Sequence, residues 1–163
     1  MPEESLLLTI AEVSIGFAGF AGIVALFGRR AAGSWSTADR VRFDALIRFA
    51  LLSLFAAFAP LAIYYISPDR GSPWRLASAI FGLALLLMFW GGPRRIAEVR
   101  ASGDSEANVR GGWVLLGAYA LVGLGLFLNA AGVCYAEAGP YLVALFLSLT
   151  MTGLMFARLL RFA

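Results

Sequence analysis

The sequence predicts an all-α membrane protein, a single domain over residues 1–163 with five transmembrane helices, and two observations support that prediction. Hydrophobic residues make up 61% of the chain and charged residues only 14%, whereas soluble domains are nearer half apolar and a quarter charged. The apolar residues also gather into runs close to the roughly 20 residues that a helix needs to cross the hydrocarbon core. These runs span residues 6–27, 49–66, 74–90, 113–134 and 141–157.

The first two runs are joined by an arginine-rich segment with the features of a helix start. Ser36 or Thr37 is a suitable N-cap, and Asp44 and Arg48 are spaced for an ion pair on one helix face. We therefore expect this segment to extend the second span. Pro60 lies inside that span and predicts a kink.

The third run is the shortest, so a chain of four spans is the alternative to five. Pro93 follows this run and opens the segment PRRIAEVR, which predicts a short surface helix. The fourth and fifth runs are separated by a tight hairpin, which Gly139 and Pro140 close.

Arginine counts orient the helices, because cytoplasmic loops carry an excess of basic residues. All thirteen basic residues are arginine; eleven fall on one side of the predicted membrane, and only Arg70 and Arg75 fall on the other. This distribution predicts an N-terminus outside and a C-terminus in the cytoplasm. The aromatic residues expected at the interfaces are Trp35, Trp90 and Trp113 on the cytoplasmic side and Tyr64, Tyr65, Trp74, Tyr135 and Tyr141 on the other.

Composition excludes several kinds of chemistry. The chain has no lysine, no histidine and one cysteine, Cys134, so it cannot build a Schiff-base lysine, a histidine general base or a Cys/His metal site. It also lacks a nucleotide-binding motif. We expect no enzyme, no cofactor, no metal site and no nucleic-acid partner. The arginine-only, alanine-rich composition is typical of a GC-rich bacterium, so we expect a multi-pass protein of a bacterial inner membrane.

Glu12 is a carboxylate inside the first apolar run. It is six residues past Leu6, which places it about 9 Å along the helix. An ionised acid facing lipid there would cost on the order of 2–3 kcal/mol. We therefore expect Glu12 to face protein or water, or to be protonated. The residues that share its helix face are Gly16, Gly19, Ile23 and either Leu26 or Phe27.

Two interpretations of this face compete. In one, the glycines pack inside a single protomer and Glu12 bonds to a neighbour such as Asn129. In the other, copies of the first span line a pore, with a ring of Glu12 at the outer mouth and a hydrophobic gate of Ile23 and Phe27. Glu137, in the outer hairpin, is then either a second acid at the mouth or a solvated loop residue.

Two resemblances bear on Glu12. The triplet AEV at residues 11–13 resembles the first helix of the small multidrug resistance transporters, which use a membrane glutamate there. Those proteins have four spans, and the likeness stops at three residues. The outside-to-inside order of acid, glycine, apolar and basic residues is similar to the pore helix of Orai calcium channels, with the chain direction reversed. This second likeness is physical analogy, and neither assigns a family.

We therefore expect a small homo-oligomeric ion channel that conducts cations, with the first transmembrane helix lining the pore. Its expected partners are membrane lipids, further copies of the same chain and an inorganic cation. One alternative is a non-conducting membrane subunit that anchors or regulates another protein. The other alternative is a proton-coupled exporter of small molecules, with Glu12 as its carrier site.

Overall fold

The computed structural model describes residues 2–32, 37–66, 72–101, 109–133 and 137–160, and of residues 25–32, 37–39, 89, 109 and 158–160 it describes the backbone alone. The helices in these ranges are α1 (Glu4–Ala32), α2 (Thr37–Ile66), α3 (Pro73–Trp90), α4 (Gly92–Ala101), α5 (Val109–Ala130) and α6 (Ala138–Leu160). Within these ranges, five segments are long and apolar enough to cross a membrane, with α4 continuing α3. The expectation of an all-helical chain with five span-length helices is confirmed, and these helices support a membrane protein.

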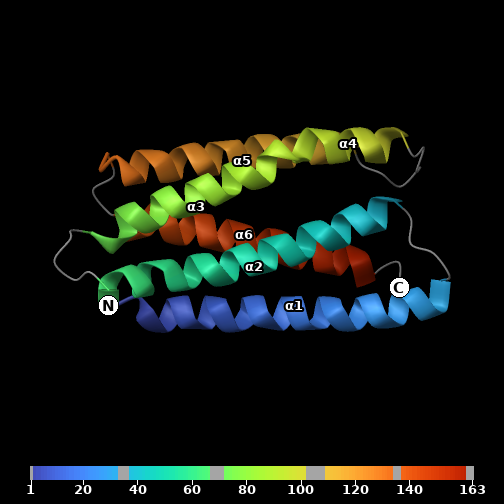
Figure 1. Cartoon of the computed structure of the whole chain (residues 1–163), viewed down its shortest axis with the longest axis horizontal. Coiled ribbons are helices and arrows are strands. Elements are labelled where there is room, and N and C mark those ends of the chain that lie inside the picture. The colour runs from blue at the N-terminus through green and yellow to red at the C-terminus, as the bar shows by residue number, and fades with distance from the viewer. Residues whose placement is uncertain (1, 33–36, 67–71, 102–108, 134–136, 161–163) are drawn as a thin grey trace.

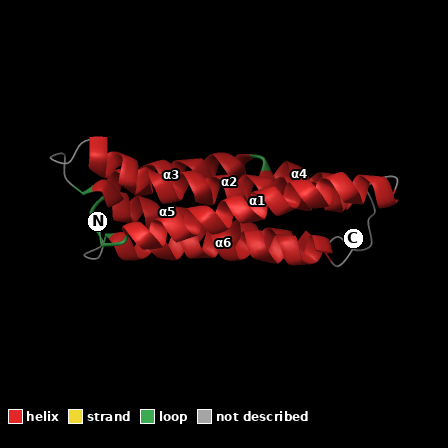
Figure 2. Ribbon diagram, turned by 90° about the horizontal axis from the view of Figure 1, so that it is seen from below, coloured by secondary structure: helices red, strands yellow, loops and turns green. Residues whose placement is uncertain are grey.

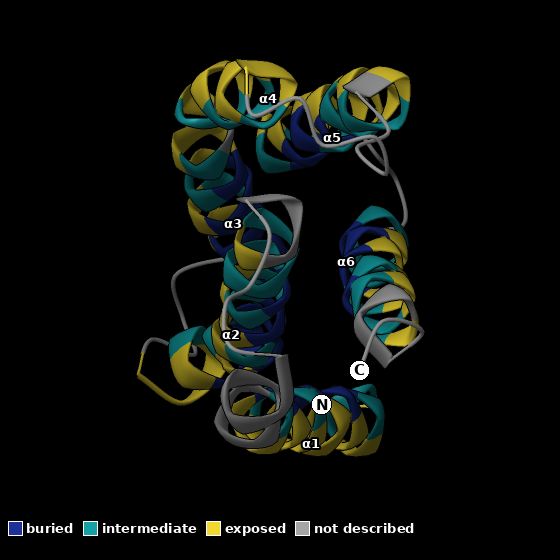
Figure 3. Cartoon of the chain, turned by 90° about the vertical axis from the view of Figure 1, so that its right-hand side faces the viewer, coloured by how far each residue is buried: buried dark blue, intermediate teal, exposed yellow. Residues whose placement is uncertain are grey.

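The helices lie side by side along one common axis (Figures 1 and 2). Helix α2 is central and packs against α1, α3 and α6, while α3 packs against α5. Helix α1 packs against α2 and α6 alone among the described helices. In the end-on view of Figure 3, α1 lies at one edge of the bundle and α4 and α5 lie at the opposite edge. Much of the surface of α1 is therefore left without a neighbouring helix.

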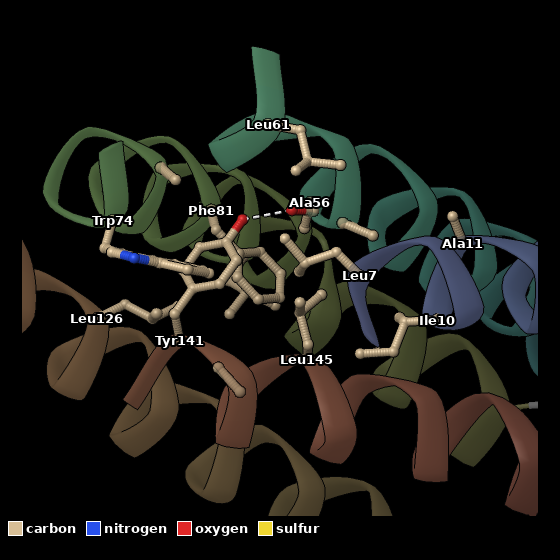
Figure 4. Close-up of a cluster of buried hydrophobic side chains, with 14 of the residues drawn as sticks. Leu7, Ile10, Ala11, Ala56, Leu61, Trp74, Phe81, Leu126, Tyr141 and Leu145 are labelled. Atoms are coloured by element: carbon tan, nitrogen blue, oxygen red, sulfur yellow. Dashed lines mark hydrogen bonds between the residues drawn. The ribbon is translucent and has the colours of Figure 1, made fainter. Parts of the chain in front are cut away.

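The principal core gathers around Tyr141 of α6, near the end of the bundle where α1 begins (Figure 4). The ring of Tyr141 lies 5.5 Å from that of Trp74 and 5.6 Å from that of Phe81, measured between centroids. Both contacts are angled, which is the favoured geometry for aromatic pairs. Leu7 of α1 and Leu145 of α6 are fully buried in the same cluster.

A proline in α2 explains the position of the Tyr141 hydroxyl. Pro60 has no N–H group, so the carbonyl of Ala56, four residues earlier, lacks its usual partner within the helix. The Tyr141 hydroxyl donates a hydrogen bond to that carbonyl (Figure 4). Helix α6 thus supplies the donor that the sequence of α2 removes, which lets Pro60 lie buried inside a span.

Two of the aromatic residues predicted at the outer interface pack inside the bundle. Trp74 and Tyr141, in the first turns of α3 and α6, are buried, with 8% and 0% of their surfaces exposed, because their rings pack together in the core. Tyr64 and Tyr65 at the same end of the bundle are exposed, as an interfacial position requires. Trp35 and Tyr135 lie outside the described residues.

Two helix boundaries refine the predicted spans. Helix α2 is continuous from Thr37, so the expected extension of the second span is confirmed, as is its ion pair between Arg48 and Asp44 (2.9 Å). Helix α5 ends at Ala130, four residues before the predicted end of the fourth span. The short segment expected after Pro93 is helical, as α4.

The early end of α5 has a local cause. Gly132 has a left-handed backbone, with φ of 77°, which favours glycine. The amides of Gly132 and Val133 donate to the carbonyls of Asn129 (3.0 Å) and Leu128 (3.1 Å). This pair of bonds is a Schellman motif, a common way to end a helix.

Candidate functional site

The face of α1 that carries Glu12 is uncovered. Glu12, Gly16 and Gly19 are all exposed, and Ile23 is 52% exposed. Outside the nearby backbone of α1, a Cβ atom added at Gly16 or Gly19 would meet no atom of the described residues within 4 Å. The structure therefore brings these four predicted site residues onto one face of the helix, turned away from the other described helices. The side chain of Phe27, the fifth member, lies outside the described residues.

The opposite face of α1 packs into the bundle. Its buried residues are Leu7, Ile10, Ala11, Ser14 and Ala21. The only polar side chain in that set is that of Ser14, whose hydroxyl donates to the carbonyl of Ile10 (2.7 Å). One side of α1 is therefore an ordinary packing surface with its polar group satisfied, while the side that holds a carboxylate is open.

Asn129 of α5 is fully buried and belongs to a different polar cluster. Its amide nitrogen donates to the Ser78 hydroxyl of α3 (2.8 Å) and to the backbone carbonyl of Glu137 (2.8 Å). Helix α1 does not pack against α5, so the interpretation in which Glu12 bonds to Asn129 is wrong. Asn129 instead ties the α5–α6 hairpin to α3.

Glu137 has a charged partner in the same cluster. Its Oε1 atom lies 2.6 Å from Nε of Arg75, and its side chain is 20% exposed. The neighbouring Ser72 side chain and the Arg75 guanidinium hold the pKa of Glu137 below its ordinary value of 4.5, against an opposing effect of partial burial. Glu137 is thus an ion-paired residue of the hairpin, a partner that neither sequence-based interpretation of this acid included.

Arg75 and Ser78 are the residues of this cluster that sequence reasoning did not identify as candidates. The guanidinium of Arg75 covers Gly132, where an added Cβ would lie 2.9 Å from the Arg75 Cζ atom. A weak signal was present, because Arg75 is one of only two arginines predicted on that side of the membrane. We call Asn129, Ser78, Glu137 and Arg75 the hairpin cluster. Its contacts hold the α5–α6 hairpin against α3, so its role is structural.

The chemistry open to the Glu12 face is that of a single carboxylate beside exposed backbone. A carboxylate attracts cations, and glycines allow a second helix to approach closely. Across the described ranges, no three Asp, Glu, His or Cys side chains lie close enough together to hold a metal ion.

Compared with known proteins, the chain matches no family model, no curated protein and no solved structure.

Proposed function

We propose that this chain forms a small homo-oligomeric cation channel in which α1 lines the pore. The observation that supports this proposal is the uncovered face of Glu12, Gly16, Gly19 and Ile23. A charged carboxylate that faces hydrocarbon costs on the order of 2–3 kcal/mol, whereas one that faces water between protein copies avoids this cost. Further copies of α1 around a wet axis give Glu12 such a setting.

The order of residues along this face suits conduction. Gly19 lies about 10 Å and Ile23 about 16 Å beyond Glu12 at the helical rise of 1.5 Å per residue. A ring of Glu12 concentrates cations at one mouth, and a ring of Ile23 forms an apolar constriction that gates by excluding water. Between them, the glycines leave the backbones close together and the passage narrow.

The proposed orientation puts the start of α1 outside a bacterial inner membrane. Its support is the gathering of arginines where α2 begins and along α4, at the end of the bundle opposite the start of α1 (Figure 1). In this orientation the Glu12 mouth opens to the outside, and cations enter toward the arginine-rich end. The hairpin cluster then lies at the outer surface.

The two alternatives differ in what they require of Glu12. An exporter needs Glu12 inside a cavity near the midplane, and an exposed position on an edge helix gives that function less support. A non-conducting subunit shares the uncovered face, but a different protein covers it. The identity of the molecule that covers α1 therefore separates the leading proposal from this last alternative.

Cysteine cross-linking tests what covers α1. In a Cys134→Ala background, we would oxidise purified protein in liposomes after introducing either Gly19→Cys or Gly117→Cys. Gly117 is the matched control, because it is an exposed glycine on α5 with no atom within 4 Å of an added Cβ. We expect covalent dimers from the Gly19→Cys variant alone. Equal cross-linking at the two positions would reject assembly through α1.

Cation flux into the same liposomes tests conduction. We expect wild-type protein to conduct, and Glu12→Gln to lower cation flux or cation preference about tenfold, which corresponds to roughly 1.4 kcal/mol. Glu98→Gln, at an exposed carboxylate of α4, is the control and should conduct as wild type does. Cross-linked protein that carries no flux would overturn the channel while leaving the oligomer, and flux unaffected by Glu12→Gln would remove Glu12 from the pathway.

A further inference from the structure

A partly open cavity of about 160 Å³ lies among α2, α3, α4, α5 and α6, and all the residues that line it come from these five helices. Its walls are mostly apolar, with Phe49 of α2 and Leu116 of α5 among them. Met88, Met151 and Met155 also line it, so three of the four methionines of the chain meet there. Methionine is flexible and polarisable, and adapts to apolar guests of different shapes.

The cavity runs from an interfacial level into the depth of the bundle. Gly112 and Tyr119 of α5 both line it, and they lie seven positions apart, about 10 Å along the helix. Trp113, next to Gly112, is 54% exposed, and Trp90, at the end of α3, is 86% exposed. Exposed tryptophans are typical of the boundary between lipid headgroups and hydrocarbon. The Gly112 end of the cavity is therefore level with headgroups, and the Tyr119 end is level with acyl chains.

Positive charge is concentrated at the headgroup end. Arg95 of α4 lines the cavity and is 28% exposed, and its Nη1 atom pairs with the Asp44 carboxylate. The same carboxylate accepts a hydrogen bond from Nε of Arg48 (2.9 Å). Two arginines thus share one acid, which leaves one net positive charge. A guanidinium has five N–H donors, and a carboxylate that also binds Arg48 cannot accept all of those of Arg95. Arg95 therefore has donors left for an anionic ligand.

We infer that this cavity binds an anionic lipid, with its acidic head at Arg95 and a segment of its acyl chain between α2, α5 and α6. An enclosed apolar cavity of about 150 Å³ accepts a guest the size of benzene. The mostly apolar walls of this partly open cavity of similar volume likewise suit a hydrocarbon segment better than a cation. Basic pockets between membrane helices on the cytoplasmic side suit anionic headgroups. The inference uses the proposed orientation but not the proposed channel, because the residues that carry it lie outside α1.

Native mass spectrometry of purified protein measures the binding directly. The probes are dioleoyl phosphatidylglycerol, phosphatidylcholine with the same two chains, and oleate as a free fatty acid. Ala45→Phe narrows the cavity, because Ala45 lines it, and Ala120→Phe places the same ring on an exposed site of α5. Arg95→Gln removes the charge at the mouth, and Arg94→Gln removes that of its exposed neighbour.

We expect wild-type protein to bind phosphatidylglycerol about tenfold more tightly than phosphatidylcholine. Ala45→Phe should weaken the binding of both, Arg95→Gln should remove the preference, and the two control variants should bind as wild type does. Should Ala45→Phe fail to fold, the comparison of Arg95→Gln with Arg94→Gln still decides the case. Equal binding of the two phospholipids by wild-type protein would overturn the inference of a phospholipid, and so would equal effects of a variant and its control. Binding of oleate alone, lost in Arg95→Gln, would instead identify a free fatty acid as the anionic lipid.

Discussion

The hairpin cluster and the Glu12 face are two polar regions within apolar helices, and the chain treats them in opposite ways. Asn129 is fully buried and donates two hydrogen bonds to groups of the same chain. Glu12 is exposed on a helix at the edge of the bundle. Polar groups at membrane depth need a protein partner or water. A polar residue with partners in its own chain therefore indicates stability, and one turned outward indicates a contact with something outside the protomer.

The largest expected difference in the free energy of unfolding is between two phenylalanine truncations, one in the buried core around Tyr141 and one on the exposed side of α1. Phe81→Ala should lower the free energy of unfolding by roughly 3 kcal/mol, because the Phe81 side chain is 2% exposed and packs against Tyr141. Phe20→Ala, on α1, should cost less than about 1 kcal/mol, because Phe20 is 59% exposed and has one tilted ring contact, with Phe156 of α6 at 6.2 Å. Unfolding of each variant by detergent titration at monomeric dilution measures both values. Similar costs at the two positions would mean that α1 is covered within the protomer after all.

A smaller effect isolates a single hydrogen bond of the covered region. Tyr141→Phe removes the donor to the Ala56 carbonyl and should cost about 1 kcal/mol, because Pro60 leaves that carbonyl without a helical partner. Tyr65→Phe is the matched control at a residue that is 67% exposed, and should be nearly neutral. The same detergent titration measures both variants. In a Pro60→Ala background the helix can satisfy Ala56 itself, so the cost of Tyr141→Phe should fall. A cost that is unchanged in that background would argue against this explanation of the hydrogen bond.

Hydropathy predicts the helices well because a membrane span is a local property of some 20 residues. The helical period likewise placed Glu12, Gly16, Gly19 and Ile23 on one face, and the structure confirms that they share it. Periodicity could not say whether that face is covered, because this depends on which helices become neighbours of α1. The pairing of Glu12 with Asn129 was wrong for the same reason, since it required α1 to pack against α5.

Contacts between residues far apart in the sequence could not be predicted from local sequence patterns. The hydroxyl of Tyr141 and the carbonyl of Ala56 are 85 residues apart, and nothing in either local sequence links them. Tyr141 is an aromatic residue near the end of a predicted span, as interfacial aromatics are. Only the helices packed around it in the folded chain reveal that it is buried. The cavity lined by Met88, Met151 and Met155 required the same knowledge, because those residues lie on two helices.

The smallest expected effect is the pH dependence of the hairpin cluster. The pKa of Glu137 is lowered in the folded chain, so its interactions stabilise the fold above the ordinary value of 4.5 and are lost as the pH falls through the lowered pKa. Wild-type protein should therefore be slightly more stable than Glu137→Gln at about pH 6 and lose this advantage toward about pH 3. The effect is small because the Arg75 side chain is 52% exposed, and water screens the pair.

Detergent titration at several pH values measures the difference in stability between wild-type protein and Glu137→Gln, and acids elsewhere in the chain titrate equally in both proteins. In an Arg75→Gln background the pH-dependent part should shrink; if it kept its full size, Arg75 would not be a cause of the lowered pKa, and the ion pair would contribute nothing to holding the hairpin against α3.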